Sequence, residues 1–249
     1  MRFILCFLFL TLQLAAFAQS SALNKGNGLL VHISYGAQLA AGDLSDRFGS
    51  STSIGGGLDF ITEKNNLIVG IEGSYQFSGN VKEDVLAGLR TPDGFIIGND
   101  RSYADIQLRQ RGFYIGGLVG KLFTLSKNNY RSGIRLTLGA GLLQHKIRIQ
   151  DDPSRFVPQL SDTYKKGYDR LSNGFSLNQF IGYQSLAKDK RVNFYAGFEF
   201  IQGFTQNRRN FNFDTRSQDT SKRLDLYFGI RLGWTLPFYM GAAANEIYY

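Results

Sequence analysis

The stretch RLDLYFGIRLGWTLPFY, residues 223–239, alternates between large apolar side chains and polar or small ones. Asp225 and Arg231 lie on the face opposite the apolar one. The apolar positions are Leu224, Leu226, Phe228, Ile230, Leu232, Trp234, Leu236 and Phe238. Because successive side chains of a strand point to opposite faces, this period of two predicts a strand with one apolar and one charged face.

The same period recurs in earlier segments of the chain, and no helical period extends beyond about two turns. The segments lie near residues 29–39, 54–60, 67–77, 107–123, 134–142, 175–183 and 192–200. Residues 107–123 carry apolar side chains on both faces, which leaves the register of that strand open.

The predicted connections alternate in length. Short connections lie at 63–66, 124–131 and 187–191, and long ones at about 40–52, 79–106, 150–173 and 206–222. An up-and-down meander with an even strand count places all short turns at one end, as in outer-membrane barrels. A soluble sandwich with Greek-key crossings gives no reason for such sorting. We therefore predict an all-β fold, an eight-stranded antiparallel up-and-down transmembrane β-barrel with four long extracellular loops.

The faces opposite the apolar ones carry acids and bases. An unpaired ion in a soluble sandwich core costs several kcal/mol, whereas the interior of a membrane barrel is polar. An eight-stranded barrel is just wide enough for its own side chains to fill. We predict a closed ion-pair network in the lumen, to which Lys121 or Arg111 could add a cation. Its members are Asp59, Glu72, Arg135, Glu199, Asp225 and Arg231.

The first residues, MRFILCFLFLTLQLAAFAQ, have the organisation of a secretory signal. Arg2 gives a positive start, an apolar core follows, and Ala16-Phe17-Ala18 is a small-x-small cleavage site. We expect a signal peptide at 1–18, a short periplasmic segment at 19–27, the barrel at 28–239 and a periplasmic tail at 240–249. Cys6, the one cysteine of the chain, falls in the signal, so disulfide and thiolate chemistry are excluded from the mature chain.

The net charge favours an anionic partner in the envelope. The chain carries +8, and loss of Arg2 with the signal leaves +7. For an exported protein, anionic lipid or lipopolysaccharide phosphate is a more natural partner than nucleic acid.

The fourth long loop interleaves arginine with phenylalanine, a combination that can grip phosphates or a partner protein. The alternative is a solvated loop whose arginines pair with its own Asp214 and Asp219. The candidate partner-binding residues are Arg208, Arg209, Phe211, Phe213 and Arg216.

Little in the chain points to catalysis, and we expect no catalytic residue, cofactor or metal site. His32 and Ser34 lie on one strand face and resemble the His-x-Ser pair of outer-membrane lipid A deacylases, but in the predicted register both point inward. No His or carboxylate cluster has metal-ligand spacing. The run GSSTSIGGG, residues 49–57, lacks the lysine of a phosphate-binding loop.

The signal ending AFAQ, the eight alternating strands and the last strand YFGIRLGWTLPFY resemble the small outer-membrane β-barrels of Bacteroidota. They are also similar to the OmpA/OmpX-type eight-stranded class. The resemblance implies a structural anchor, an adhesin, or an accessory subunit of a machine for secretion or outer-membrane protein assembly. Such barrels usually end on the aromatic residue of the last strand, whereas here MGAAANEIYY follows Tyr239. That segment is either a tail or an assembly signal at Tyr248-Tyr249.

The leading hypothesis is a non-enzymatic integral outer-membrane barrel whose extracellular loops dock a partner protein or lipopolysaccharide. One alternative is a barrel enzyme that modifies lipid A. Another is a soluble periplasmic barrel that binds a small hydrophobic ligand, with the apolar face inside.

Overall fold

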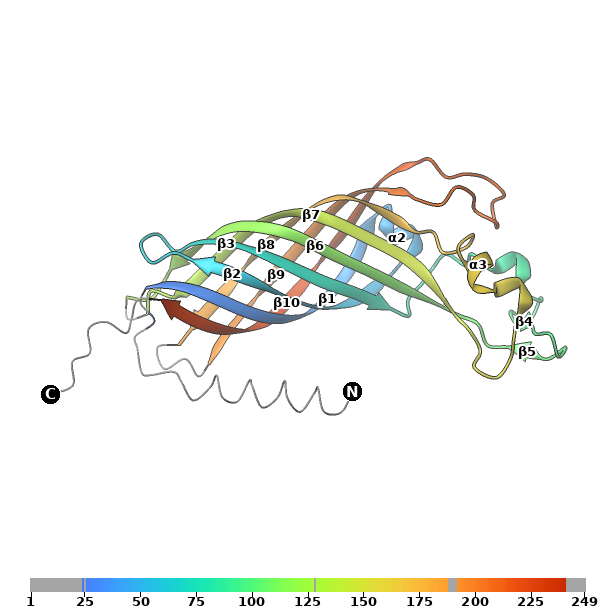
Figure 1. Ribbon diagram of the computed structural model, residues 1–249, viewed down its shortest axis with the longest axis horizontal. Coiled ribbons are helices and arrows are strands. Elements are labelled where there is room, and N and C mark those ends of the chain that lie inside the picture. The colour runs from blue at the N-terminus through green and yellow to red at the C-terminus, as the bar shows by residue number, and fades with distance from the viewer. Residues whose placement is uncertain (1–23, 25, 128, 188–191, 241–249) are drawn as a thin grey trace.

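The computed structural model describes residues 24, 26–127, 129–187 and 192–240. Eight long antiparallel strands form its body (Figure 1). Each pairs with its neighbour along the chain, and the first pairs with the last, which closes the barrel and confirms the predicted up-and-down topology. The strands are β1 (Asn27–Gly42), β2 (Ser50–Ile61), β3 (Leu67–Ser78), β6 (Gln107–Thr124), β7 (Ser132–Gln150), β8 (Ser172–Leu186), β9 (Asn193–Asn207) and β10 (Lys222–Met240).

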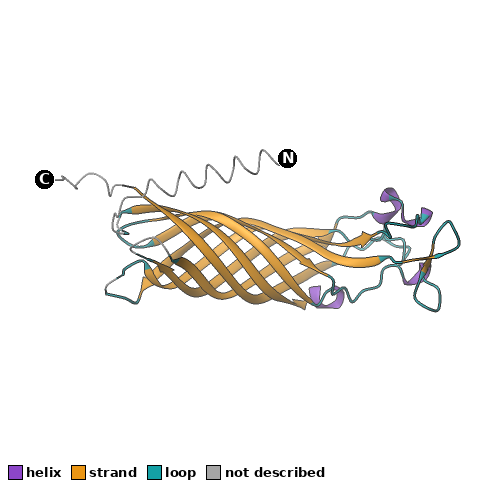
Figure 2. Cartoon of the chain, turned by 90° about the horizontal axis from the view of Figure 1, so that it is seen from below, coloured by secondary structure: helices purple, strands orange, loops and turns teal. Residues whose placement is uncertain are grey.

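The remaining elements are short and lie in connections at one end of the barrel, called here the loop end (Figure 2). The connections there span 43–49, 79–106, 151–171 and 208–221, and together they form the loop cap. The first is shorter than expected because the β1–β2 ladder extends to Leu39 and Ser50. The short elements are α2 (Leu44–Arg47), η1 (Ala87–Leu89), β4 (Ile96–Ile97), β5 (Tyr103–Ala104), η2 (Pro158–Leu160) and α3 (Asp162–Lys165).

The opposite end, the turn end, carries the connections 62–66, 125–131 and 187–192. The predicted sorting by length is therefore confirmed for the connections 79–106, 151–171 and 208–221, whereas 43–49 is no longer than 125–131. Among the described residues, no helix is long and apolar enough to cross a membrane.

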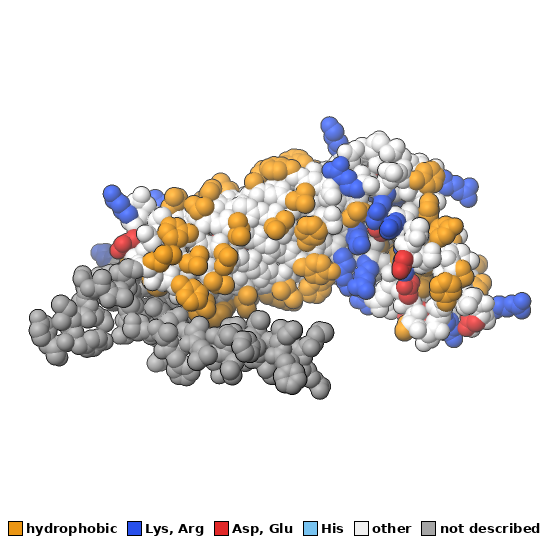
Figure 3. All heavy atoms as spheres, in the orientation of Figure 1, with side chains coloured by type: hydrophobic (Ala, Val, Ile, Leu, Met, Phe, Trp, Pro, Cys, Tyr) orange, Lys and Arg blue, Asp and Glu red, His pale blue; other side chains and the backbone are white. Residues whose placement is uncertain are grey.

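The large apolar side chains of the strands point away from the barrel axis, as their period predicts. Ile33, Ile71 and Phe198 are 63%, 61% and 68% exposed, and Figure 3 shows apolar side chains distributed along the barrel wall. The register left open for 107–123 is also settled. On β6, Ile115 and Val119 lie outside, whereas Tyr114, Leu118 and Leu122 point inward.

This orientation contradicts the soluble-barrel alternative, which requires the apolar faces to line the interior. Asp59, Arg135 and Gln184 are fully buried inside the barrel, while the apolar partners on the same strands are exposed. Because paired residues of an antiparallel ladder share a face, a single strand can turn its apolar side inward only by a one-residue slip against both neighbours.

Glycine on the inner face makes room for bulky neighbours. A Cβ atom at Gly233 would collide with the Tyr195 ring, and one at Gly116 would collide with the Tyr114 hydroxyl. At these two positions, an inward glycine accommodates a large side chain in the narrow barrel.

Several predictions from the sequence lie outside the described residues. They are the signal peptide at 1–18 with Cys6, nearly all of the segment at 19–27, and the tail at 241–249 with its terminal tyrosines.

Candidate functional site

The middle of the lumen holds two linked groups of ion pairs, and the first is built around Asp59. Arg135 Nη2 lies 2.7 Å from Asp59 Oδ2, and His32 Nε2 lies 3.3 Å from the same oxygen. Gln184 Oε1 accepts a second bond from Arg135 Nη1 at 2.9 Å. The Arg135 and Asp59 side chains are essentially unexposed. Each buried charge is therefore stabilised by the opposite charge of its partner.

The second group places one guanidinium between two carboxylates. Arg231 Nη1 lies 2.9 Å from Glu72 Oε2 and 2.8 Å from Glu199 Oε1. Asn178 Nδ2 donates to Glu72 at 2.7 Å and to Glu199 at 3.1 Å. Gln38 Nε2 donates to the second Glu199 oxygen at 2.9 Å. Arg231 is therefore the only cation that the described contacts give to these two acids.

Tyr195 joins the two groups. Its ring lies 5.1 Å from the Arg135 guanidinium carbon and 5.7 Å from that of Arg231, within cation–π range. Its hydroxyl lies 3.0 Å from His32 Nδ1, and Phe180 covers Arg231 from 4.6 Å. We call Asp59, Glu72, Glu199, Arg135, Arg231 and His32 the ionic layer.

Asp225 points into the lumen as predicted, but it does not join this layer, and the predicted pairing with its arginines is wrong. It is six residues from Arg231 on β10, about 20 Å along a strand. Instead, Asp225 Oδ2 lies 2.7 Å from His145 Nε2 and accepts a hydrogen bond from Thr205. All three side chains are buried near the loop end.

Lys121 and Arg111, the further cations considered for the lumen, also lie elsewhere. Both fall on the outer face of β6, since Gln110 and Leu122 beside them are fully buried. Lys121 Nζ lies 5.5 Å from the outer Phe123 ring.

Apolar layers close the lumen on both sides of the ionic layer. The layer toward the turn end is capped by Arg131, which is fully buried and donates to Thr62 O at 3.0 Å and Asn66 Oδ1 at 2.6 Å. Its apolar members are Leu30, Ile61, Ile68, Leu118, Leu122 and Leu186. The layer toward the loop end is continuous with the core of the loop cap. It includes Leu44, Phe48, Val85, Leu86, Ile96, Leu143, Ile147, Val157, Leu160 and Ile201.

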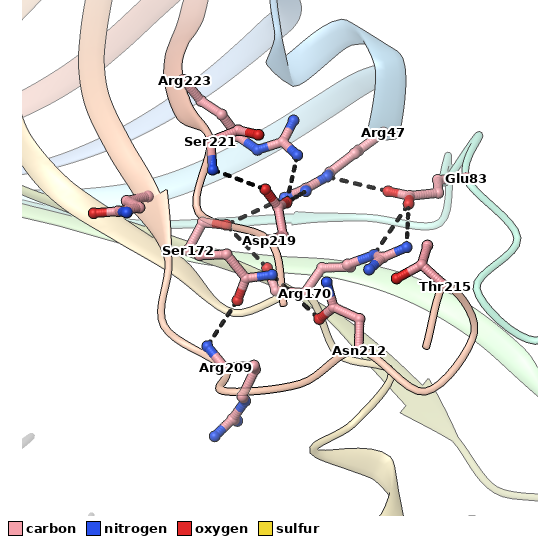
Figure 4. A network of polar contacts seen from close by, with 12 residues as sticks. Arg47, Glu83, Arg170, Ser172, Arg209, Asn212, Thr215, Asp219, Ser221 and Arg223 are labelled. Atoms are coloured by element: carbon pink, nitrogen blue, oxygen red, sulfur yellow. Dashed lines mark hydrogen bonds and ion pairs between the residues drawn. The ribbon is translucent and has the colours of Figure 1, made fainter. Parts of the chain in front are cut away.

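Ion pairs join all four connections of the loop cap (Figure 4). Arg47 of α2 contacts Glu83 at 3.1 Å and Asp219 at 3.5 Å. Arg170 contacts Glu83 at 3.0 Å and Asp214 at 2.5 Å. Both guanidinium groups are almost fully buried. Arginines that are paired, buried and shared between loops hold the cap in one arrangement.

The fourth connection is part of this bracing, which changes the interpretation of its predicted binding residues. Arg209 forms a two-bond pair with Asp169, with contacts of 2.8 and 2.5 Å. Arg208 Nε donates to Asn173 Oδ1 at 2.6 Å, and the Phe213 ring packs 5.5 Å from that of Tyr168. Arg209 is thus used largely within the molecule, whereas Arg208 and Phe213 make these contacts and still keep part of their side chains exposed.

Phe211 and Arg216, the other two predicted binding residues, remain exposed. The alternative, in which the arginines of this loop pair with its own Asp214 and Asp219, holds only in part. Asp219 accepts from Arg223 at the start of β10 at 2.7 Å, but Asp214 binds Arg170 of the third connection.

The most exposed apolar surface of the cap lies elsewhere, at the β4–β5 hairpin. The Phe95 and Tyr103 rings stack at 4.9 Å, and Ile97 and Phe156 are 50% and 61% exposed. A hydrogen bond from Asn99 N to Phe156 O, 3.0 Å long, joins the hairpin to the third connection. We call Phe95, Ile97, Tyr103 and Phe156 the aromatic tip. Sequence reasoning missed it, although the run GFIIG at 94–98 inside a loop was a usable signal.

The His-x-Ser pair considered for lipid A chemistry does not face the outer wall. His32 is buried, and both of its ring nitrogens lie beside Asp59 or Tyr195. No cluster of three or more potential metal ligands occurs in the part of the chain that the structure describes.

Comparison with known proteins gives a distant structural match. No protein-family model and no curated protein matches the chain. Two solved structures of Ail, the attachment invasion locus protein of Yersinia pestis, align with it at 11% and 12% identity. Each alignment has a TM-score of 0.40 and covers 86% of this chain and 99% of Ail. One of these structures is a complex with the heparin analogue sucrose octasulfate. The score is too low to support a functional inference.

The ionic layer predicts an asymmetric response to mutation. Arg231→Met should destabilise the barrel by about 3–5 kcal/mol, because it leaves two buried carboxylates without their cation. Glu72→Gln should cost only about 1 kcal/mol, because a one-to-one pair with Glu199 remains. Urea unfolding in micelles, followed by gel mobility of folded and unfolded forms, measures both. Equal costs for the two variants would contradict the shared-cation arrangement.

Asp219 makes the loop cap sensitive to acid. Burial raises the pKa of its carboxyl group, but hydrogen bonds from Arg223 and Ser221 outweigh burial and hold the pKa at about 2. A carboxylate with a lowered pKa in the folded state stabilises that state above its unfolded pKa of about 3.9. This contribution is lost as the pH falls from about 4 to about 2.

Pepsin cleavage of the fourth connection should therefore accelerate between pH 4 and pH 2. Asp219→Asn should raise cleavage at pH 4 and flatten this dependence, because the ionised carboxylate is already absent. Identical pH profiles for both proteins would show that Asp219 does not brace the cap.

Proposed function

We propose that the chain is a non-enzymatic integral outer-membrane β-barrel that holds a rigid extracellular loop cap for docking a partner protein. The continuous apolar outer wall supports this proposal most directly. A soluble protein rarely exposes contiguous apolar patches above a few hundred Å², whereas here every long strand carries large exposed apolar side chains.

The dimensions of the wall fit a membrane. On β6, the outward cations Arg111 and Lys121 bracket Phe113, Ile115 and Val119. They are ten residues apart, or roughly 33 Å along the strand at ~3.3 Å per residue. At a tilt of about 40° this separation spans about 25 Å along the barrel axis, the height of the apolar band of outer-membrane barrels.

The layered lumen supports an anchoring role. Between the two apolar layers, the ionic layer fills the cross-section with paired side chains, and Arg131 covers the turn end. Such packing gives rigidity without a path for ions. Export by the predicted signal peptide and membership of the Bacteroidota-type group remain predictions.

The loop cap offers one surface suited to a protein partner. Its arginines are largely consumed in bracing, while the aromatic tip presents large apolar side chains on a fixed hairpin. Protein interfaces are enriched in such aromatic residues at their centres. A machine for secretion or outer-membrane protein assembly is one setting for this partner.

Planar bilayers that contain the purified, folded protein should show no steady conductance, because side chains fill the lumen. Gel mobility with and without heating identifies the folded sample. Large, stable single-channel currents would refute a sealed lumen.

A photoreactive amino acid at Tyr103 should crosslink the protein to a partner in intact cells, because the aromatic tip is exposed on a rigid hairpin. The same group at Phe211, an exposed aromatic residue outside the tip, is the matched control. Crosslinks at Phe211 with none at Tyr103 would move the docking surface away from the tip.

A further inference from the structure

Four cations gather on the outer wall where β6 and β7 approach the loop cap. They are Arg109, Arg111, Lys146 and Arg148, which we call the basic patch. The ladder places Arg109 directly opposite Arg148, and Arg111 directly opposite Lys146. Like charges at facing positions of an antiparallel pair repel one another, since their Cβ atoms are only about 5 Å apart. An arrangement that costs stability on its own calls for a counterion.

The protein does not supply that counterion. Arg109 donates to two neutral oxygens, Gln150 Oε1 at 2.6 Å and Gln107 Oε1 at 2.7 Å. Arg111 Nη1 donates to a backbone carbonyl, that of Gln110. Among the described residues, no ion pair joins any member of the patch to a carboxylate. The patch differs in this from the loop cap, where Arg47, Arg170 and Arg209 each contact an acid.

The nearest acids along the two strands bind other groups. Asp105 Oδ2 accepts from Gln107 Nε2 at 2.9 Å, and Asp151 Oδ2 accepts from Lys165 Nζ at 2.5 Å. Both carboxylates are thus held in the loop cap, beyond the last cross-strand pair of β6 and β7.

The basic patch borders the apolar wall. Arg111 faces Phe77 across the β3–β6 pairing, and the outward residues that follow it on β6 are Phe113 and Ile115. Figure 3 shows Lys and Arg side chains gathered where the barrel wall meets the loop cap. In the proposed membrane orientation, this is the level of the outer-leaflet head groups.

A groove of about 560 Å³ adjoins the patch on the outer wall. Arg109 and Arg111 form its cationic part, and the small side chains of β2 leave the wall recessed between β1 and β3. Its other lining includes apolar Ala37, Leu39 and Phe77 and the hydroxyl-bearing Ser50 and Thr52. The groove therefore combines cations, hydroxyl groups and an apolar surface along one path.

We propose that the basic patch and this groove bind a phosphorylated glycolipid of the outer leaflet. Each facing pair of cations holds a phosphate group between its members, with arginine donating through two N–H groups. Sugar hydroxyls bond Ser50 and Thr52, and an acyl chain lies against Leu39 and Phe77. The inference rests on the proposed function, since it requires the barrel to sit in a bilayer. It places the glycolipid on the barrel wall and leaves the loop cap to a protein.

The test combines Arg111→Gln and Lys146→Gln in one double variant. The matched control is Lys121→Gln, on the same strand as Arg111 but at the turn end. Each protein, purified in uncharged detergent, is titrated with bisphosphorylated lipid A, with dephosphorylated lipid A and with inorganic phosphate. The double variant should bind bisphosphorylated lipid A at least tenfold more weakly than wild type and the Lys121 control. Wild type should likewise bind dephosphorylated lipid A at least tenfold more weakly than bisphosphorylated lipid A.

A second readout uses stability without lipid. Removing one facing pair of cations relieves repulsion, so the double variant should unfold in detergent at a urea concentration equal to or above that of wild type. Added lipid A should stabilise wild type and not the double variant.

Unchanged lipid A affinity in the double variant, or equal affinity for the dephosphorylated lipid, would overturn the proposal. Displacement of lipid A by an equal concentration of inorganic phosphate would do so too, since it would reveal a simple anion site. Insertion of all three proteins into vesicles tests the membrane barrel separately, so failure of the glycolipid site is distinguishable from failure of the proposed function.

Discussion

The register of the hydrogen-bond ladder, which closes between β1 and β10, determines which side chains of neighbouring strands share a face. With Ile33 opposite Trp234 and Ser34 opposite Gly233, apolar residues of both strands share the outer face. A one-residue slip of β10 would turn its apolar residues inward and move Arg231 out of the ionic layer. No strand of the barrel has a free edge at which such a slip could begin. The apolar wall and the charged interior are thus two consequences of one register.

The interior charges suit an anchor better than a soluble core. A buried ion pair adds little stability over a well-packed apolar replacement, yet breaking it is costly. Sharing Arg231 between Glu72 and Glu199 links three strands through one side chain. The apolar layer above continues into the loop cap without interruption. The cap is therefore an extension of the barrel core, braced further by Arg47 and Arg170, and the outer wall beneath it is where unpaired cations remain.

The strands could be predicted from the sequence because each buries one face, so apolar and polar residues alternate with a period of two along most segments. The register of the segment 107–123 could not be predicted because both of its faces are apolar. Its inward residues Tyr114, Leu118 and Leu122 belong to the apolar layers of the lumen. The partners of the charged residues were harder to predict from the sequence. The sequence shows which residues are charged but not which of them meet. Asp225 pairs with His145 because the two lie at the same level along the barrel axis, and Arg209 pairs with Asp169 because two distant loops make contact. The basic patch likewise depends on which residues face each other across β6 and β7.

The outward orientation can be measured on the unmodified protein, because Trp234 is the only tryptophan in the chain and lies on the outer wall, 47% exposed. The measurement is quenching of its fluorescence in vesicles, by lipids with brominated acyl chains and by aqueous acrylamide. Bromine on the chains should quench most of the emission, and acrylamide should have little effect. Strong quenching by acrylamide with no effect of the brominated lipids would contradict a barrel that turns its apolar wall to the bilayer.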